Sequence, residues 1–374
     1  MNAIDHWTMP RRRFETLAVI GAGAFGTALS AAAARAGLAV RLFGRNAETV
    51  DEINRDRLNT AYLGDTVLPD GIQAFTEIED ALQGAEAALL VVPSAGIRDA
   101  ARAMRAVCRP LMPVVICAKG VEPSTGLLLS DVVREEMPGH PVAALSGPTF
   151  ADEIAADLPT TVTIAAALAP GEALDTGLAA RLALSLSAGS FRAYVSDDLT
   201  GVEIGGAMKN VIAIACGISR GAGFRANMTA ALITRGLAEM TQLATELGGR
   251  ADTISGLSGL GDLTLTCSSE QSRNLRFGLQ LGGGAKREQT FDGAPVIVEG
   301  VRNSVSVTDL ARRHGLTLPI CEAVRAIVHD DADIVSTLGL LWARPLEAES
   351  HEIDVTIRHP NASEAREKIE GLIG

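Results

Sequence analysis

Aromatic residues are scarce in this chain, since Trp, Tyr and Phe together make up 3% of its 374 residues. A chain that is poor in aromatics and rich in Ala, Leu and Gly favours close-packed helices and tight turns over an aromatic-rich β-sandwich. Hydrophobic residues still reach 47%, which is enough apolar material for two cores. At this length, two domains are the natural expectation.

Cysteine is sparse as well, and no CxxC pair occurs in the sequence. An odd number of scattered cysteines fits buried thiols in a reducing cytosol better than disulfides or a zinc site. We therefore expect a cytoplasmic protein without a bound metal. The five cysteines are Cys108, Cys117, Cys216, Cys267 and Cys321.

Positive charge is in deficit, and the formal net charge is -12. This balance argues against general nucleic-acid binding, which requires a basic surface. It does not exclude small anionic ligands, because a few local cations can hold them. The sequence shows no apolar run of transmembrane length, and residues 1–15 lack the apolar core of a signal peptide, so we expect no membrane insertion.

Short buried-strand patterns alternate with helical stretches up to residue 196, which predicts a doubly wound α/β domain over residues 16–196. From residue 197 the periodicity becomes helical with no strand pattern, which predicts an all-α domain over residues 197–348. Residues 1–15 are expected to be an N-terminal extension and residues 349–374 a polar tail. The strand patterns cover residues 16–20, 39–43, 87–93, 113–120, 142–148 and 160–166.

A glycine-rich turn, GAGAFG, follows the first strand pattern and opens an alanine-rich helix that Gly37 ends. Gly21, Gly23 and Gly26 match the GxGxxG pattern, in which glycines permit a tight turn and a close approach of the backbone to a pyrophosphate. The strand before the turn and the helix after it favour dinucleotide binding over a merely structural turn.

The second strand ends in FGRN (Phe43 to Asn46), with no acidic residue to bind a ribose 2′-hydroxyl. Arg45 can pair with a 2′-phosphate or stack on adenine, so NADP and NAD both remain open. The alternative is an ordinary solvated arginine after a strand.

A Lys-Asn pair interrupts the helical segment EIGGAMKNVIAIACGI (Glu203 to Ile218), which otherwise reads as buried. Burying an ammonium group costs free energy unless the group is paired or loses its proton. A functional role would explain a lysine at position 209, and the role that we expect for Lys209 is proton transfer. Gly205 and Gly206 are costly in a helix interior and indicate close approach of another backbone or a ligand. The alternative is a snorkelling lysine beside a packing glycine pair.

Two further segments carry polar residues at helix ends. SGLSGLGDLTLTC holds Asp262 in a tight connection between helices, where an aspartate is most often a turn or cap former. Ser272, Arg273 and Asn274 then open the helix RNLRFGLQLG. Donors at a helix start together with an arginine suit a phosphate, although the segment can equally be an ordinary capped helix.

Together these segments resemble the bacterial-type NAD(P)-dependent glycerol-3-phosphate dehydrogenase family over nearly the whole chain. In family order they are GAGAFGTAL, LFGRN, VVPS, AKGVE, LSGPTFADEIA, LPTTVTIA, VEIGGAMKNVIAIACGI, GLSGLGDLTLTC, SRNLRFG, VEG and RPLEAE. The resemblance implies a Rossmann-type domain followed by a helical domain like the C-terminal domain of 6-phosphogluconate dehydrogenase. It also implies reversible, NAD(P)H-dependent reduction of dihydroxyacetone phosphate to sn-glycerol 3-phosphate for phospholipid synthesis. The apolar helices of the second domain suggest a homodimer.

The resemblance further implies roles for individual residues. Lys209 would be the general acid/base that handles the proton on the C2 oxygen. The substrate-binding positions would be Lys119, Gly147, Thr149, Lys209, Asp262, Ser272, Arg273 and Asn274. The cofactor-binding positions would be Gly21, Gly23, Ala24, Phe25, Gly26, Arg45, Lys119, Ala151, Arg273, Ile297 and Glu299.

The chain departs from the family pattern at a few positions. Phe25 stands where the family often has Trp, Thr149 stands where it often has Ser, and the loop before Ile297 differs. Two other functions stay open on the sequence: another β-hydroxyacid dehydrogenase, of the 6-phosphogluconate or hydroxyisobutyrate type, and a non-catalytic dinucleotide-binding sensor.

Overall fold

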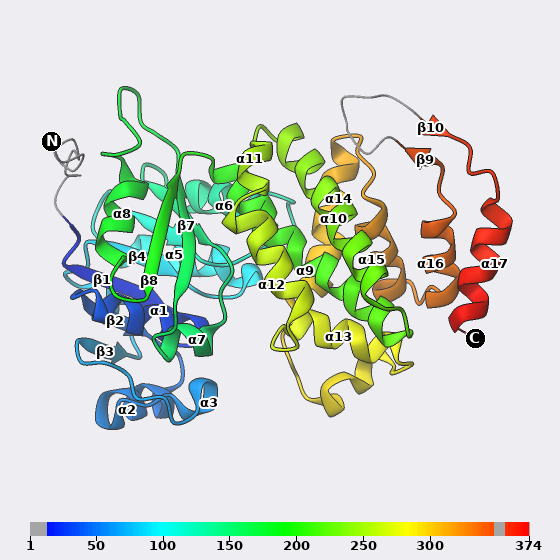
Figure 1. Ribbon diagram of the computed structural model, residues 1–374. Helices are drawn as coiled ribbons and strands as arrows, with labels where there is room; N and C mark the ends of the chain where they lie inside the picture. The colour runs from blue at the N-terminus through cyan, green and yellow to red at the C-terminus, as the bar shows by residue number, and fades with distance from the viewer. Residues whose placement is uncertain (1–12, 348–355, 374) are drawn as a thin grey trace, which may run out of the picture. The chain divides into compact units, whose positions relative to one another are not determined.

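The computed structural model describes residues 13–347 and 356–373, which form two compact units (Figure 1). The first unit comprises the chain up to Ala207 together with Ala244–Leu265, and the second comprises Met208–Leu243 together with the chain from Thr266. The chain passes between the units within three helices, α9 (Leu199–Gly221), α10 (Ala226–Glu246) and α12 (Asp262–Ser268). The predicted domain boundary at residue 197 falls just before α9, whereas the units change inside this helix.

An eight-stranded sheet forms the centre of the first unit, in the order β3-β2-β1-β4-β5-β6-β7-β8. All neighbouring strands are parallel except β6 and β7, which are antiparallel. This arrangement confirms the predicted α/β class. The strands are β1 (Thr16–Ile20), β2 (Ala39–Phe43), β3 (Ile72–Phe75), β4 (Ala87–Leu90), β5 (Val114–Ile116), β6 (Val142–Ser146), β7 (Thr160–Ala166) and β8 (Phe191–Ser196).

Helices cover both faces of this sheet because alternate side chains of a strand point to opposite faces. In β1, Leu17 and Val19 belong to one buried cluster and Ala18 and Ile20 to the other. The first cluster includes side chains of α1 (Ala24–Arg35) and α8 (Leu178–Leu186), and the second those of α5 (Ile97–Val107) and α6 (Leu129–Glu136). Other helices of this unit are α2 (Ala47–Asp56), α3 (Thr60–Leu63), α4 (Ile78–Leu82), α7 (Ala151–Ala155) and α11 (Ala251–Ile254), with a 3-10 turn (Ser94–Gly96) and a π turn (Leu257–Gly261).

The second unit is helical, as predicted, apart from one short pair of strands. The antiparallel strands β9 (Leu346–Glu347) and β10 (Thr356–Ile357) contradict the expectation that no strand follows residue 197. Two residues per strand are too few to give a readable alternation pattern. The helices are α13 (Arg273–Gly282), α14 (Glu299–Arg313), α15 (Pro319–His329), α16 (Ile334–Trp342) and α17 (Ala362–Ile373), with a 3-10 segment (Arg287–Gly293).

The region predicted to be a polar tail contains helix α17, which packs against α16. Ile369 of α17 is buried, and a Cβ added to Gly339 of α16 would lie 3.2 Å from Cγ of Arg366. The first part of this region, up to residue 355, lies outside the described residues, as does most of the predicted N-terminal extension.

Glycines bring helices α9 and α13 into backbone contact within the second unit. A Cβ added to Gly217 of α9 would lie 2.3 Å from the carbonyl oxygen of Leu275, and one added to Gly278 of α13 would lie 2.2 Å from that of Ile214. No side chain fits at these separations, so both positions require glycine. The close packing fixes how far the start of α13 lies from α9.

Helix α9 corrects the expectation that no apolar run reaches transmembrane length. By length and hydropathy it is the one membrane-span candidate among the described residues, and its apolar window is entirely buried. A core helix of a water-soluble protein satisfies the same criteria.

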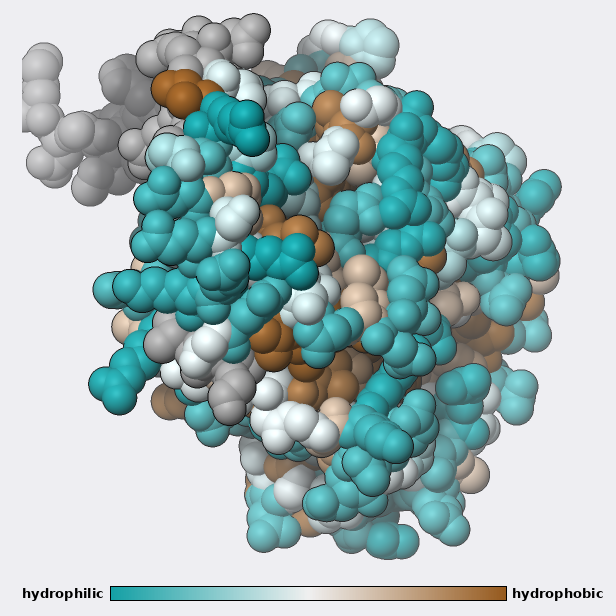
Figure 2. All heavy atoms as spheres, turned by 90° about the vertical axis from the view of Figure 1, so that its right-hand side faces the viewer, coloured by the Kyte–Doolittle hydropathy of each residue, from teal (hydrophilic) through white to brown (hydrophobic). Residues whose placement is uncertain are grey.

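The face seen in Figure 2 is largely hydrophilic, with smaller hydrophobic groups between the polar side chains. Helix α16 carries two large exposed apolar side chains, Leu340 at 56% exposure and Trp342 at 48%. Scattered apolar side chains of this kind are ordinary on protein surfaces. The predicted homodimer therefore stays a prediction.

Candidate functional site

The glycine turn between β1 and α1 has the strand–turn–helix context that the sequence predicts. Gly21 has a φ of +124°, and a Cβ added there would lie 2.5 Å from the carbonyl oxygen of Val91. A Cβ added to Gly26 would lie 1.8 Å from the carbonyl oxygen of Gly21. Both glycines are therefore required by the backbone alone, whether or not a ligand binds.

Gly23 differs from these two, because a Cβ added there would meet no atom of the described residues within 4 Å. Gly23 caps α1, no side chain caps the helix, and its first turn, with Ala24 and Phe25, contains no acidic residue. The first N–H groups of this twelve-residue helix thus have no side-chain cap. An anionic pyrophosphate fits this end of α1, so these residues suit a dinucleotide.

Arg45 is exposed directly after β2, where it follows Gly44. The next residue, Asn46, caps α2 by accepting a hydrogen bond from the backbone N–H of Thr49 at 3.1 Å. The end of β2 thus presents a cation where NAD-specific Rossmann proteins place a carboxylate.

Lys119 and Asp262 form a buried ion pair in the first unit, although 143 positions separate them in the sequence. Nζ of Lys119 lies 2.5 Å from Oδ2 of Asp262, and the two side chains are 15% and 0% exposed. Lys119 follows β5, and Asp262 begins α12 after the π turn. Breaking a buried ion pair by removing one partner typically costs about 3–5 kcal/mol. Asp262 therefore does more than form a turn.

The loop after β6 converges on the same lysine. The carbonyl oxygen of Gly147 accepts hydrogen bonds from Nζ of Lys119 and from Oγ1 of Thr149, both at 3.2 Å. Gly147 has a φ of +150°, and a Cβ added there would lie 2.9 Å from Cα of Val162, so only glycine fits. Ala151, a predicted cofactor contact, begins α7 directly after this loop.

The two glycines of the predicted Lys-Asn helix lie in close contact with other parts of the first unit. A Cβ added to Gly205 would lie 2.6 Å from the carbonyl oxygen of Ser258, and one added to Gly206 would lie 3.2 Å from Cγ of Lys119. The predicted close approach at these glycines is confirmed.

Lys209 lies in the second unit, and its side chain is buried, with 6% of the residue exposed. Its Nζ donates a hydrogen bond to Oγ1 of Thr266, which is also buried, at 2.8 Å. The sequence analysis did not select Thr266. The signal available was its spacing, because Thr266 lies one helical turn after Asp262 in α12.

Ser272, Arg273 and Asn274 open helix α13, as predicted. Oγ of Ser272 caps the helix by accepting from the N–H of Leu275 at 3.2 Å, and Arg273 is exposed in the first turn. The Asn274 amide donates to Oδ1 of Asn210 and accepts from the N–H of Gly300, both at 2.9 Å. Asn274 thus joins α9, α13 and α14, and Asn210 is a partner that the predicted site list lacked.

Ile297 and Glu299 lie at the start of α14, next to Gly300. Ile297 is 48% exposed, and Glu299 is the first residue of the helix. The preceding loop, which departs from the family pattern, contains Phe291 and Asp292 in left-handed conformations, with φ of 54° and 56°. The roles predicted for Ile297 and Glu299 stay predictions.

Glu203 is a buried carboxyl on α9 in the first unit. Its Oε1 accepts from the N–H of Ser130, near the start of α6, at 2.8 Å. Burial raises the pKa of the Glu203 carboxyl to about 7. This side chain therefore titrates near neutral pH.

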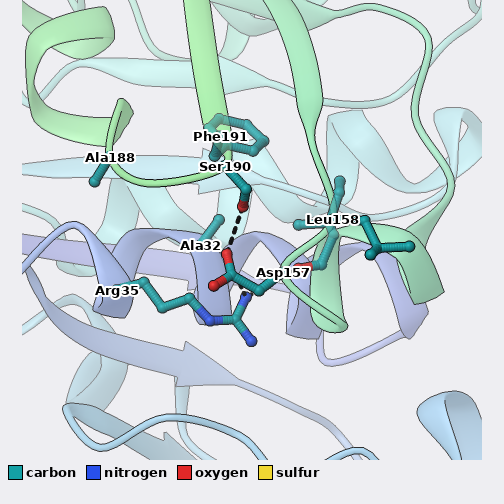
Figure 3. Close-up of a pocket in the computed structure, with 8 residues that line it drawn as sticks. Ala32, Arg35, Asp157, Leu158, Ala188, Ser190 and Phe191 are labelled. Carbon is teal, nitrogen blue, oxygen red and sulfur yellow. Dashed lines mark hydrogen bonds and ion pairs between the residues drawn. The ribbon is translucent and has the colours of Figure 1, made fainter.

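The hollow drawn in Figure 3 contains none of the predicted site residues. Arg35, at the end of α1, donates to the carbonyl oxygens of Ile154 and Ala155 at 2.9 and 2.5 Å, and Asp157 bonds to Ser190. Arg35 thus satisfies the last carbonyls of α7. The residues that line the hollow hold helices together, and the N-terminal ends of these helices contain predicted cofactor positions.

Comparison with known proteins gives a consistent picture. A model of the N-terminus of NAD-dependent glycerol-3-phosphate dehydrogenase matches residues 16–169, and a model of the C-terminus of the same family matches residues 198–338. The chain is 45% identical over 333 residues to a protein of Brucella ovis named NAD(P)+ glycerol-3-phosphate dehydrogenase, covering 89% of this chain and 98% of that protein. It is 46% identical over 337 residues to a protein of the same name from Caulobacter vibrioides, covering 90% and 99% of the two chains.

Solved structures agree with these sequence matches. The crystal structure of glycerol-3-phosphate dehydrogenase from Coxiella burnetii superposes with a TM-score of 0.81 at 37% identity, covering 87% of this chain and 97% of that chain. The yeast glycerol-3-phosphate dehydrogenase structure superposes with a TM-score of 0.76 at 23% identity, covering 88% and 99% of the two chains, and supports the fold alone.

Proposed function

Because the chain belongs to the NAD-dependent glycerol-3-phosphate dehydrogenase family, we propose that it interconverts dihydroxyacetone phosphate and sn-glycerol 3-phosphate with NAD(P)H. Two family models and relatives at 45% and 46% identity support this proposal. Reduction adds a hydride to C2 of the ketone and a proton to its oxygen, which yields the secondary alcohol. Hydride exchange with C2 is the chemistry that a bound nicotinamide supplies.

The glycine turn and the end of α1 would hold the pyrophosphate of the dinucleotide. The open space at Gly23 and the uncapped N-terminus of α1 support this assignment. Arg45 would face the adenosine ribose, where its charge accommodates a 2′-phosphate. The chain therefore accepts NADP without a change at this position.

We infer that Lys209 donates the proton to the C2 oxygen during reduction and takes it back during oxidation. The observation that carries this assignment is the burial of Lys209, with Nζ bonded to Oγ1 of Thr266. A hydroxyl partner orients the amine, which suits a group that gives and takes a proton.

Lys119 would supply positive charge near the carbonyl oxygen as negative charge develops on it. The ion pair with the buried Asp262 fixes this nitrogen in position, so the charge needs little reorganisation during the reaction. The Gly147 carbonyl fixes the same nitrogen from a second direction.

Arg273 and the first turn of α13 would bind the substrate phosphate. Ser272 occupies one N–H of this turn, that of Leu275, and the remaining N–H groups and the exposed guanidinium are suited to an anion. Asn274 would orient this turn through its bonds to Asn210 and Gly300.

A steady-state assay of the purified full chain tests the proposed reaction. Dihydroxyacetone phosphate would be tested as a substrate for reduction, with NADH and with NADPH. The hydroxyacids 6-phosphogluconate and 3-hydroxyisobutyrate would be tested as substrates for oxidation, with NAD and with NADP. We expect turnover with dihydroxyacetone phosphate alone. Turnover of either hydroxyacid would instead indicate a related dehydrogenase, and tight NADPH binding without any turnover would indicate a sensor.

We further infer that the protein is a cytoplasmic homodimer whose product serves phospholipid synthesis. None of the five cysteines, all within the described residues, forms a disulfide, and four of them are buried, which supports a reducing compartment. Light scattering on the purified chain tests the dimer, because a monomeric mass at assay concentration would contradict it.

A further inference from the structure

We propose that Arg98 is a positioning residue for Lys119, acting through Glu122 in the loop that follows β5. The inference rests on the proposed function in one respect, since Lys119 must serve the reaction for its position to affect turnover. All of the residues that carry the inference lie in the first unit.

Arg98 binds the carboxylate of Glu122 in a bidentate arrangement. Nε of Arg98 donates to Oε1 of Glu122 at 2.9 Å, and Nη2 donates to Oε2 at 2.8 Å. Two parallel N–H···O bonds fix both the direction and the distance of a carboxylate, which a single bond does not. Glu122 is 7% exposed and lies three residues after Lys119.

Glu122 in turn closes the loop that carries Lys119. Its N–H donates to the carbonyl oxygen of Leu127 at 3.0 Å, and its own carbonyl accepts from Gly126 at 2.7 Å. Its Oε2 also accepts from Oγ1 of Thr125 at 2.6 Å. Backbone and carboxylate of one residue therefore organise residues 122–127, and Arg98 attaches this organised loop to α5.

Such an anchor matters because the bonds of Lys119 to Asp262 and to the Gly147 carbonyl hold the end of its side chain. Nζ reaches Asp262 and the Gly147 carbonyl, but a long flexible side chain can reach the same partners from several backbone positions. The Arg98–Glu122 contact restricts the backbone from which Lys119 extends. A displacement of about 1 Å at a reacting group can cost on the order of 100-fold in rate.

The charges around Arg98 make this contact hard to replace. The same guanidinium also binds Glu136 at 2.7 Å and Glu135 at 2.9 Å, so it serves three carboxylates. Its hydrogen bonds lower the pKa of the Glu122 carboxyl, which keeps that group ionised. Without Arg98, a nearly buried carboxylate would face Glu136 without its cation, and the loop would move to bring it to water.

Arg102 offers a matched control on the same helix. It lies one turn after Arg98 and binds Glu136 at 2.8 Å, whereas Arg98 also binds Glu122. A role limited to tying α5 to α6 would therefore be shared by Arg98 and Arg102. A role in positioning Lys119 belongs to Arg98.

The test compares Arg98→Met, Arg98→Lys and Arg102→Met by turnover and by amide hydrogen exchange of residues 117–128. We expect Arg98→Met to lower kcat for dihydroxyacetone phosphate by about tenfold or more. The rate of amide hydrogen exchange in residues 117–128 should rise by about tenfold in the same variant. Arg98→Lys should recover part of both losses, and Arg102→Met should match the unaltered protein in both.

Wild-type kcat and loop exchange in a folded Arg98→Met variant would overturn the proposal, as would equal losses in Arg102→Met. If Arg98→Met does not fold, Glu122→Gln decides, because the amide keeps the shape of the carboxylate and removes its charge. We expect this variant to show the same loss of kcat and faster loop exchange, and unchanged values would overturn the proposal. If the unaltered chain does not turn over dihydroxyacetone phosphate, the proposed function fails, while hydrogen exchange still decides whether Arg98 fixes the loop.

Discussion

Lys119 and Lys209 are held by different kinds of partner. Lys119 pairs with the fully buried Asp262 carboxylate, and Lys209 donates to the hydroxyl of Thr266. A carboxylate stabilises the ammonium form strongly, whereas a hydroxyl accepts a hydrogen bond and also donates one. The carboxylate of Asp262 thus fixes the position of Lys119, and the hydroxyl of Thr266 helps to orient the amine of Lys209.

Glu203 makes the stability of the protein depend on pH. Burial raises its folded-state pKa to about 7, above the ordinary 4.5, so the folded chain holds this proton where the unfolded chain releases it. The contribution of Glu203 to stability is therefore fully present below pH 4.5 and is lost as pH rises toward 7.

Glu203→Gln removes this titration while its amide oxygen still accepts from Ser130. We expect the variant to be more stable than the unaltered chain at pH 8, by a few kcal/mol at most, with the difference shrinking at pH 5. Thermal melting at the two pH values measures the effect. A difference in melting temperature that is equal at both would refute this account of Glu203.

At the scale of secondary-structure elements, the sequence predicts the strands that consist of continuous apolar runs. The strand patterns of β1, β2, β4, β5, β6 and β7 are found in the structure. The two strands that it missed, β3 and β8, lie at the edges of the sheet, where partly exposed polar residues break the apolar run. Helix α17 was missed because few of its residues are buried.

The side-chain pairings within the site could not be predicted from the sequence either. Lys119 lies at the end of a predicted strand, and Asp262 lies in a predicted turn. Each segment can be explained without the other. Nothing local in either segment specifies the other as its partner. The family resemblance grouped both residues, but it did not give the ion pair, the Thr266 bond or the Asn210–Asn274 bond.

The backbone contact between α9 and α13 yields a prediction at this scale. Gly217→Ala places a methyl group 2.3 Å from the Leu275 carbonyl oxygen, which forces the helices apart and weakens the Asn210–Asn274 bond. We expect a loss of about 1–3 kcal/mol in stability and a higher KM for dihydroxyacetone phosphate, with KM for NAD(P)H unchanged. Steady-state kinetics and thermal melting measure both.

Gly371→Ala is the matched control, because it adds the same methyl group to α17 where no atom lies within 4 Å. We expect unchanged kinetics and a gain of up to about 1 kcal/mol. A normal substrate KM in Gly217→Ala would show that the α9–α13 contact does not set the substrate site.

At the scale of the whole molecule, the family match accounts for residues 16–169 and 198–338, and β9, β10 and α17 lie beyond it. The predicted site residues all lie within the matched ranges. The first unit contains the glycine turn and the Lys119–Asp262 pair, and the second contains Lys209 and the start of α13. Helices α9, α10 and α12 connect the two units covalently.

The most direct test of the proposed chemistry is the turnover of Lys209→Ala with dihydroxyacetone phosphate, measured beside its affinity for NAD(P)H. The exposed Lys368→Ala serves as a control that should leave both unchanged. We expect kcat of Lys209→Ala to fall by about 10²–10⁴-fold, as the loss of a general acid does, while cofactor affinity stays at the wild-type value. Turnover close to that of the unaltered chain would contradict the assignment of Lys209 as the proton donor.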